Sequence, residues 1–220
     1  MANDISLTFL GHACVLIETG TSRLLLDPGN LSQPLGGVGP LDAVLITHGH
    51  PDHLDTDQMR SLTTDGGVAL YGPADLAEQV RDLDVTFTAV ETGAFEVAGV
   101  EVVATQSTHE TLYPGFPLPV NMGYEIAGRV FTPGDALSAP SQSVDVLLAP
   151  LAGPWMKASE GIDFVRSIEP TVVIPIHDGG LGPAHRGLHR ALFTNFGPKA
   201  TTFTPLDPGK SYTLTEGTAR

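Results

Sequence analysis

The stretch 43–53, AVLITHGHPDH, places four potential metal ligands directly after a short apolar run. These ligands are His48, His50, Asp52 and His53. Residues 43–47 are typical of a buried strand. Imidazoles two residues apart in an extended loop can converge on one cation, whereas Asp52 and His53, where a helix would start, can turn toward a second. Because burying such a cluster requires a partner for every polar group, the stretch predicts a metal site.

Three more candidate ligands occur in the same setting, each just past a β-type run. They are His109 after 102–105, Asp135 after 130–134 and His177 after 172–176. The seven side chains exceed what one tetrahedral ion can use, but they suit two ions that share a carboxylate and a hydroxide. We therefore expect a site for two divalent ions.

The order of these residues resembles the metallo-β-lactamase superfamily. His48-Gly-His50-Pro-Asp52-His53 matches its H-x-H-x-D-H signature, and the later His, Gly-Asp and Pro-Ile-His segments follow in that order over nearly the whole chain. Leu10-Gly-His12, Leu26-Asp27-Pro28 and LAPLAGPWM at 148–156 resemble the small single-domain group related to ascorbate-6-phosphate lactonase. The resemblance implies a four-layer αβ/βα sandwich forming one domain over residues 1–220.

The resemblance also implies how the ligands divide. His48, His50 and His109 would hold one ion, Asp52, His53 and His177 the other, and Asp135 would bridge them. Zinc is the expected metal, with Mn²⁺ or Fe²⁺ as alternatives. A water between two such ions loses its proton near neutral pH, and we expect that hydroxide to attack a small-molecule lactone, ester or phosphodiester, with Asp52 and Asp135 as the catalytic carboxylates.

The residues at two positions narrow the range of reactions expected within this superfamily. Position 50 is His where the related flavodiiron oxidoreductases have Glu, which argues against an O₂- or NO-reducing centre. Position 135 is Asp where many antibiotic-hydrolysing relatives have Cys, which argues against periplasmic β-lactam hydrolysis. Two other functions stay open: an RNA or DNA phosphodiesterase of the same fold, and a metal-binding protein without turnover.

The net charge and the hydrophobic pattern indicate which binding partners and which cellular compartment to expect. Eleven Lys and Arg against 25 Asp and Glu give the 220-residue chain a net charge of −14, which disfavours nucleic acid and anionic lipid. No apolar run reaches the length of a membrane span, and residues 1–14 lack the pattern of a signal peptide. We expect a cytoplasmic protein with a small-molecule substrate and no membrane attachment; homo-oligomer formation stays open.

Several residues have two interpretations each. His12 lies near the metals in the resembled group, or it is a structural residue between strands. Asp27 either orients a ligand imidazole or forms a turn. His185 and His189, four apart on an expected helix, fit a solvated face better than a metal site. The single Cys14 is expected to be a small core residue.

Aromatic residues suggest the walls of a pocket. Tyr113 and Phe116 lie in the loop 110–121 that follows His109, and this loop would be a wall or a lid. Trp155, with Met156, would form another wall. Ordinary loop packing is the alternative for both.

The hydrophobic pattern predicts strands and helices in two halves. Helices are expected after Asp52 and after Pro73, and over 159–168 and 184–193. Tight turns at Ala98-Gly99 and Gly128-Arg129 predict antiparallel hairpins. Two strand-rich halves with helices predict two packed sheets with helices outside. Strands are expected over 5–10, 14–19, 23–26, 43–47, 68–71, 86–90, 95–97, 100–104, 124–127, 130–132, 144–148 and 171–174.

Overall fold

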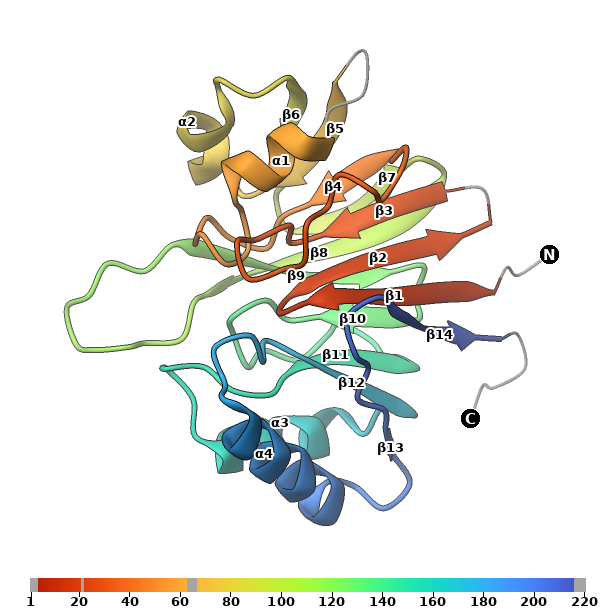
Figure 1. Cartoon of the computed structure of the whole chain (residues 1–220), viewed down its shortest axis with the longest axis vertical. Coiled ribbons are helices and arrows are strands. Elements are labelled where there is room, and N and C mark those ends of the chain that lie inside the picture. The colour runs from red at the N-terminus through yellow and green to blue at the C-terminus, as the bar shows by residue number, and fades with distance from the viewer. Residues whose placement is uncertain (1–3, 21, 63–66, 216–220) are drawn as a thin grey trace.

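The computed structural model of the chain describes residues 4–20, 22–62 and 67–215, and within them two seven-stranded sheets pack face to face (Figure 1). The first sheet has the order β14-β1-β2-β3-β4-β5-β6, antiparallel from β14 to β3 and parallel from β3 to β6. Its strands are β1 Ile5–Gly11, β2 Cys14–Thr19, β3 Ser22–Leu26, β4 Ala43–Leu45, β5 Val68–Gly72, β6 Val85–Ala89 and β14 Lys210–Leu214.

The second sheet has the order β13-β12-β11-β10-β9-β8-β7, antiparallel from β7 to β10 and parallel from β10 to β13. Its strands are β7 Gly93–Val97, β8 Val100–Thr108, β9 Val120–Ile126, β10 Val130–Thr132, β11 Val146–Pro150, β12 Val172–Ile176 and β13 Thr202–Phe203.

The helices cover the outer faces of the two sheets (Figure 1). The first sheet carries α1 Thr56–Leu62, the short 3₁₀ helix Ala74–Leu76 and α2 Ala77–Val80, whereas the second carries α3 Ala158–Ile168 and α4 Pro183–Phe196. Buried side chains form three clusters. One includes Leu7 and Tyr124 between the sheets, another includes Met59 of α1 against the first sheet, and the third includes Val165 of α3 against the second sheet. The predicted four-layer αβ/βα sandwich is confirmed.

Most predicted elements are present with shifted ends. Both predicted hairpins exist, and positive φ angles at Ala98 and Ala127 mark their turns. The helix expected after Pro73 is shorter than predicted, because α2 ends at Val80 and Leu83 lies in a turn. The expected strand 43–47 ends at Leu45, and strands β13 and β14 were not predicted at all. Within the described ranges, no helix is long and apolar enough to cross a membrane.

Candidate metal centre

The polar residues that follow β4 are held in a compact turn. The backbone N–H groups of His53 and Leu54 both donate to the carbonyl of His50, at 2.9 and 2.8 Å. Gly29 packs against this turn so closely that a Cβ atom there would lie 1.8 Å from the carbonyl oxygen of Asp52. A side chain larger than hydrogen is therefore excluded at position 29, and this contact fixes Asp52 and His53.

Asp135, after β10, lies at the centre of the cluster. Its Oδ1 is 3.2 Å from Nε2 of His53, and its Oδ2 is 3.1 Å from Nε2 of His177, 3.3 Å from Nε2 of His109 and 3.9 Å from Nε2 of His48. The carboxylate is 3% exposed. One carboxylate thus faces imidazoles from the ends of β4, β8 and β12 at once.

Two further residues hold Asp135 in this position. The backbone N–H of Asp135 donates to Oδ1 of Asn121 at 2.9 Å, and the indole Nε1 of Trp155 donates to Oδ2 of Asp135 at 3.0 Å. Sequence reasoning did not identify Asn121, whose side chain is fully buried and also donates to the carbonyl of Pro133. The available signal was an amide side chain within the mostly apolar stretch 120–126, VNMGYEI.

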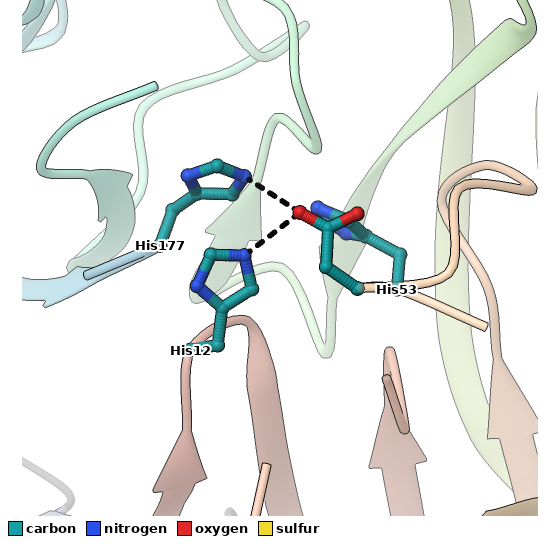
Figure 2. Close-up of side chains that lie close together, drawn as sticks. His12, His53 and His177 are labelled. Carbon is teal, nitrogen blue, oxygen red and sulfur yellow. Dashed lines mark hydrogen bonds and ion pairs between the residues drawn. The ribbon is translucent and has the colours of Figure 1, made fainter. Parts of the chain in front are cut away.

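The candidate ligands form two groups, and within each the ligand atoms lie within 4.8 Å of one another. One group is His48, His50, His109 and Asp135; the other is His12, Asp52, His53 and His177. Figure 2 shows the imidazoles of His12, His53 and His177 pointing toward one another, with dashed lines for the contacts of His12 and His177 with Asp52. The structure therefore brings together all seven predicted ligands and adds His12.

Hydrogen bonds at Nδ1 decide which ring nitrogen faces the centre. Nδ1 of His53 lies 2.8 Å from the Asp27 carboxylate, Nδ1 of His109 lies 2.6 Å from the Glu110 carbonyl, and Nδ1 of His177 lies 2.5 Å from the Ala152 carbonyl. Because carboxylate and carbonyl oxygens only accept hydrogen bonds, Nδ1 carries the proton in all three rings. Each Nε2 therefore keeps its lone pair in the neutral ring. Asp27 thus orients a candidate ligand and also accepts from the backbone N–H of Thr47 at 2.8 Å.

The buried lone pairs at the centre fit a metal. Nε2 of His53, His109 and His177 and Oδ1 of Asp135 are buried atoms that make no hydrogen bond among the described residues. Polar atoms buried without partners are costly, and here they converge. Nitrogen and carboxylate oxygen are donors that Zn²⁺, Mn²⁺ and Fe²⁺ accept, so the residues present fit bound divalent cations.

Burial and neighbouring charges act in opposite directions on the pKa values at this centre. Burial raises the pKa of Asp135, but His53 and His177 outweigh it and hold the pKa well below its ordinary value. Burial lowers the pKa of His53, but Asp135 and Asp27 outweigh it and raise the pKa well above the ordinary value. For His48, burial dominates and lowers the pKa. These directions favour an ionised Asp135 beside a protonated His53 and a neutral His48, and a cation bound at Nε2 of His53 would take the place of its proton.

His12 is tied to the same centre from the turn between β1 and β2. Its φ is 54°, and its Nδ1 accepts from the backbone N–H of Gly179 at 3.0 Å. Burial lowers the pKa of His12, so the neutral ring keeps its proton on Nε2 and donates to Oδ2 of Asp52 at 3.1 Å. Of its two interpretations, the structure favours contact with the centre, through Asp52.

A cavity of about 490 Å³ opens onto the second group. Its lining is His12, Leu31, Asp52, Ala152, Gly153, Pro154, Met156, His177, Gly180, Leu181 and His189. A second cavity of about 310 Å³ reaches His50 from the side of α2 and residues 117–119. The centre therefore lies beneath one mostly apolar cavity and beside a smaller one.

Three of the four expected pocket residues, Tyr113, Phe116 and Trp155, line neither of these two cavities, whereas Met156 lines the larger one. Tyr113 and Phe116 are 74% and 52% exposed and line neither cavity, because the loop that carries them projects from the molecule (Figure 1). Trp155 is buried against Asp135, while Met156 lines the larger cavity. The prediction that His189 lies on a solvated helix face is wrong. His189 is half-buried and lines the larger cavity, because α4 packs beside Leu151.

The predictions for His185 and Cys14 are confirmed. His185, one turn before His189, is exposed as expected. Cys14 is fully buried in the core, also as expected.

Comparisons with known proteins agree with this architecture. A family model described as beta-lactamase superfamily domain matches residues 6–177. Protein Rv0786c of Mycobacterium tuberculosis is 38% identical over 197 residues, which cover 86% of this chain and 92% of that protein. A UPF0173 metal-dependent hydrolase of Korarchaeum cryptofilum is 29% identical over 229 residues, covering 96% and 100%. The solved structure of Igni18, a metallo hydrolase of Ignicoccus hospitalis, is similar in fold, with a TM-score of 0.73 and 17% identity over 96% of this chain and 99% of that one.

Proposed function

The chain belongs to the metallo-β-lactamase superfamily, and from this membership and the two facing groups of ligands we propose that it is a hydrolase that uses two divalent metal ions to cleave small, uncharged esters or lactones. The observation that carries the proposal is the position of Asp135, which faces imidazoles of both groups, one of them being His177, a residue that lines the larger cavity. The Korarchaeum relative is named a metal-dependent hydrolase, which supports the same class.

Each group has a defined part in this proposal. His48, His50 and His109 would hold one ion, Asp52, His53 and His177 the other, and Asp135 would contact both. Divalent ions bound there would lower the pKa of water and polarise the scissile group. Zinc is the proposed metal, with Mn²⁺ or Fe²⁺ as alternatives, because the donors are imidazole and carboxylate.

The chain's own residues would orient the site around the ions. Asp27 and the carbonyls of Glu110 and Ala152 keep Nδ1 protonated in His53, His109 and His177, which leaves Nε2 available. Trp155 and Asn121 hold Asp135 in place. A centre fixed by such contacts needs little rearrangement when a substrate enters.

The cavity lining supports an uncharged substrate. Leu31, Ala152, Pro154, Met156 and Leu181 supply apolar surface, and no Lys or Arg is among the described residues that line the cavity. Divalent ions can bind a phosphate group, but Arg, Lys or a set of backbone N–H groups usually contributes to its binding as well. An uncharged ester or lactone therefore suits this wall better than a phosphorylated substrate.

A substrate panel tests the proposal. The purified protein, loaded with Zn²⁺ or Mn²⁺, is assayed with p-nitrophenyl acetate, p-nitrophenyl butyrate and a γ-lactone, and in parallel with p-nitrophenyl phosphate and bis-p-nitrophenyl phosphate. We expect higher kcat/KM for the uncharged group, loss of activity with a chelator and recovery when metal is returned. Turnover restricted to the phosphate compounds would overturn the substrate class, and no turnover of any compound by metal-loaded protein would overturn the function.

A further inference from the structure

The larger cavity contains one polar side chain that the metal centre does not use. Among the described residues that line it, the polar side chains are His12, Asp52, His177 and His189, and the first three belong to the second group of the centre. His189 comes from α4, which follows the loop that carries the candidate ligand His177. It belongs to neither ligand group.

A backbone carbonyl fixes the ring of His189. Its Nδ1 lies 3.0 Å from the carbonyl oxygen of Leu151. Since a carbonyl only accepts, Nδ1 carries a proton, and Nε2 is the atom left for another partner. No hydrogen bond to Nε2 of His189 is present among the described residues, and the side chain is half-buried at the cavity wall.

The same short segment orients His189 and a ligand of the centre. The carbonyl of Leu151 accepts from Nδ1 of His189, and the next carbonyl, of Ala152, accepts from Nδ1 of His177. Both rings line one cavity, to which Ala152 also contributes. The segment after β11 therefore sets the position of His189 relative to the candidate metal ligands.

The end of the cavity near α4 is held rigidly as well. Arg186 and Arg190, on α4, form ion pairs with the buried carboxylate of Asp178 at 3.2 and 3.4 Å. Arg186 also donates to the carbonyls of Asp178 and Leu181. Because Asp178 follows His177 directly, these contacts join α4 to the ligand loop. Both arginines are thus engaged with that loop, which leaves His189 as the polar group of α4 that lines the cavity.

From this arrangement we propose that His189 donates the proton that the leaving group needs, a role that rests on the proposed ester or lactone hydrolysis. Water supplies the oxygen of the new bond to the carbonyl carbon and gives up a proton. The bond from that carbon to the leaving oxygen breaks, and its electron pair stays on the leaving oxygen. Because the neutral ring has its proton on Nδ1, Nε2 of His189 first takes a proton from solvent water, and the leaving oxygen then takes that proton from Nε2. The proton that the attacking water gives up returns to solvent, so that ester and water give acid and alcohol.

The other histidines of the cavity are less suited to this step. The Nε2 proton of His12 is directed to Asp52, and Nε2 of His177 lies 3.1 Å from Asp135 within the candidate ligand set. A proton donor must have an atom that can reach the substrate. His189 meets this requirement from the cavity wall.

The experiment compares leaving groups in the metal-loaded, full-length protein. The variants are His189→Gln and His189→Ala, and the matched control is His185→Gln, an exposed histidine one turn earlier on α4. The substrates are acetate esters with the same acyl group: p-nitrophenyl acetate, whose leaving group needs little help from an acid, and benzyl and ethyl acetate, whose leaving groups need a proton. Metal content is measured for every variant.

We expect kcat/KM of the His189 variants to fall roughly 100- to 10,000-fold for the alkyl esters and less than about threefold for p-nitrophenyl acetate. Metal content should stay at the wild-type value, and His185→Gln should behave as wild type. An equal loss for all esters, no loss, or a loss of bound metal would overturn the role of His189 while leaving ester hydrolysis intact. A wild-type protein that cleaves no ester would remove the proposed function and this role with it.

Discussion

Nδ1 of His53 lies 2.8 Å from Oδ2 of Asp27, and both side chains are only 1% exposed. The same carboxylate oxygen accepts from the hydroxyl of Thr47 at 2.7 Å, and Oδ1 accepts from the Thr47 backbone N–H. Asp27 therefore connects the end of β3 to the residues after β4 and sets the proton of His53 on Nδ1. The two Thr47 contacts involve no candidate ligand, yet they hold the carboxylate that orients the ring of His53.

This contact predicts the effect of Asp27→Asn. The amide oxygen can still accept from Thr47, but the amide nitrogen would face Nδ1 of His53 and move the ring proton to Nε2. We expect roughly 10- to 100-fold weaker binding of metal, measured by competition with a chromophoric chelator. Asp42→Asn, at an exposed carboxylate that accepts from the Arg23 backbone N–H, is the control and should bind metal normally. Unchanged affinity in Asp27→Asn would show that the ring does not depend on this carboxylate.

The two groups predict different results for Asp135→Ala and His50→Ala. Asp135 faces both groups, so its loss should remove most of the bound metal and abolish turnover. His50 belongs to one group, with Nδ1 3.1 Å from Nε2 of His48, so its loss should abolish turnover but release less metal. Metal content by mass spectrometry and kcat/KM are the measurements, with His185→Ala as control. Wild-type turnover in either variant would contradict the assignment.

We expect a substitution at Gly29 to act through the backbone of Asp52, against which Gly29 packs. In Gly29→Ala the added methyl group would meet the Asp52 backbone, so the turn that carries Asp52 and His53 must move. We expect a loss of about 1–3 kcal/mol in unfolding free energy together with weaker metal binding. Gly36→Ala is the matched control, because a Cβ there meets nothing within 4 Å. Denaturant unfolding and metal titration measure both; identical results for the two variants would refute the tight contact.

Cys14 should be unreactive in the folded protein. Burial raises the pKa of its thiol well above the ordinary value, so at mildly alkaline pH the reactive thiolate is scarcer than for an exposed thiol. The side chain is also inaccessible. A colorimetric disulfide reagent should report almost no thiol in native protein and one per chain in denaturant. Rapid reaction of the native protein would mean that the core around Cys14 opens readily.

The convergence of the candidate ligands and the sheet architecture could be predicted because both depend on local pattern. An apolar strand followed directly by His48 and its neighbours is visible in a short window, and so are the runs before His109 and His177. The ends of α2 were harder, because Leu83 continues the helical spacing while the chain already turns at Val80. Strands β13 and β14 are short and mostly exposed, so they lack the apolar signal that marks the others.

The features that the sequence pattern left open or placed wrongly depend on contacts between distant segments. His12 contacts Asp52 only because the first turn meets residue 179, and His189 enters the cavity only because α4 packs beside Leu151. Tyr113 and Phe116 have the composition of a pocket wall, but the direction of a loop is set by its whole path over the sandwich. Spacing alone contains no such information.

Diffraction from crystals of the metal-loaded protein, recorded at the absorption edge of the bound metal, tests the central claim most directly. Two anomalous peaks per chain are expected, one within the group of His48, His50 and His109 and the other within the group of Asp52, His53 and His177, with Asp135 between them. A single peak, or peaks away from Asp135, would contradict a centre in which two ions act together.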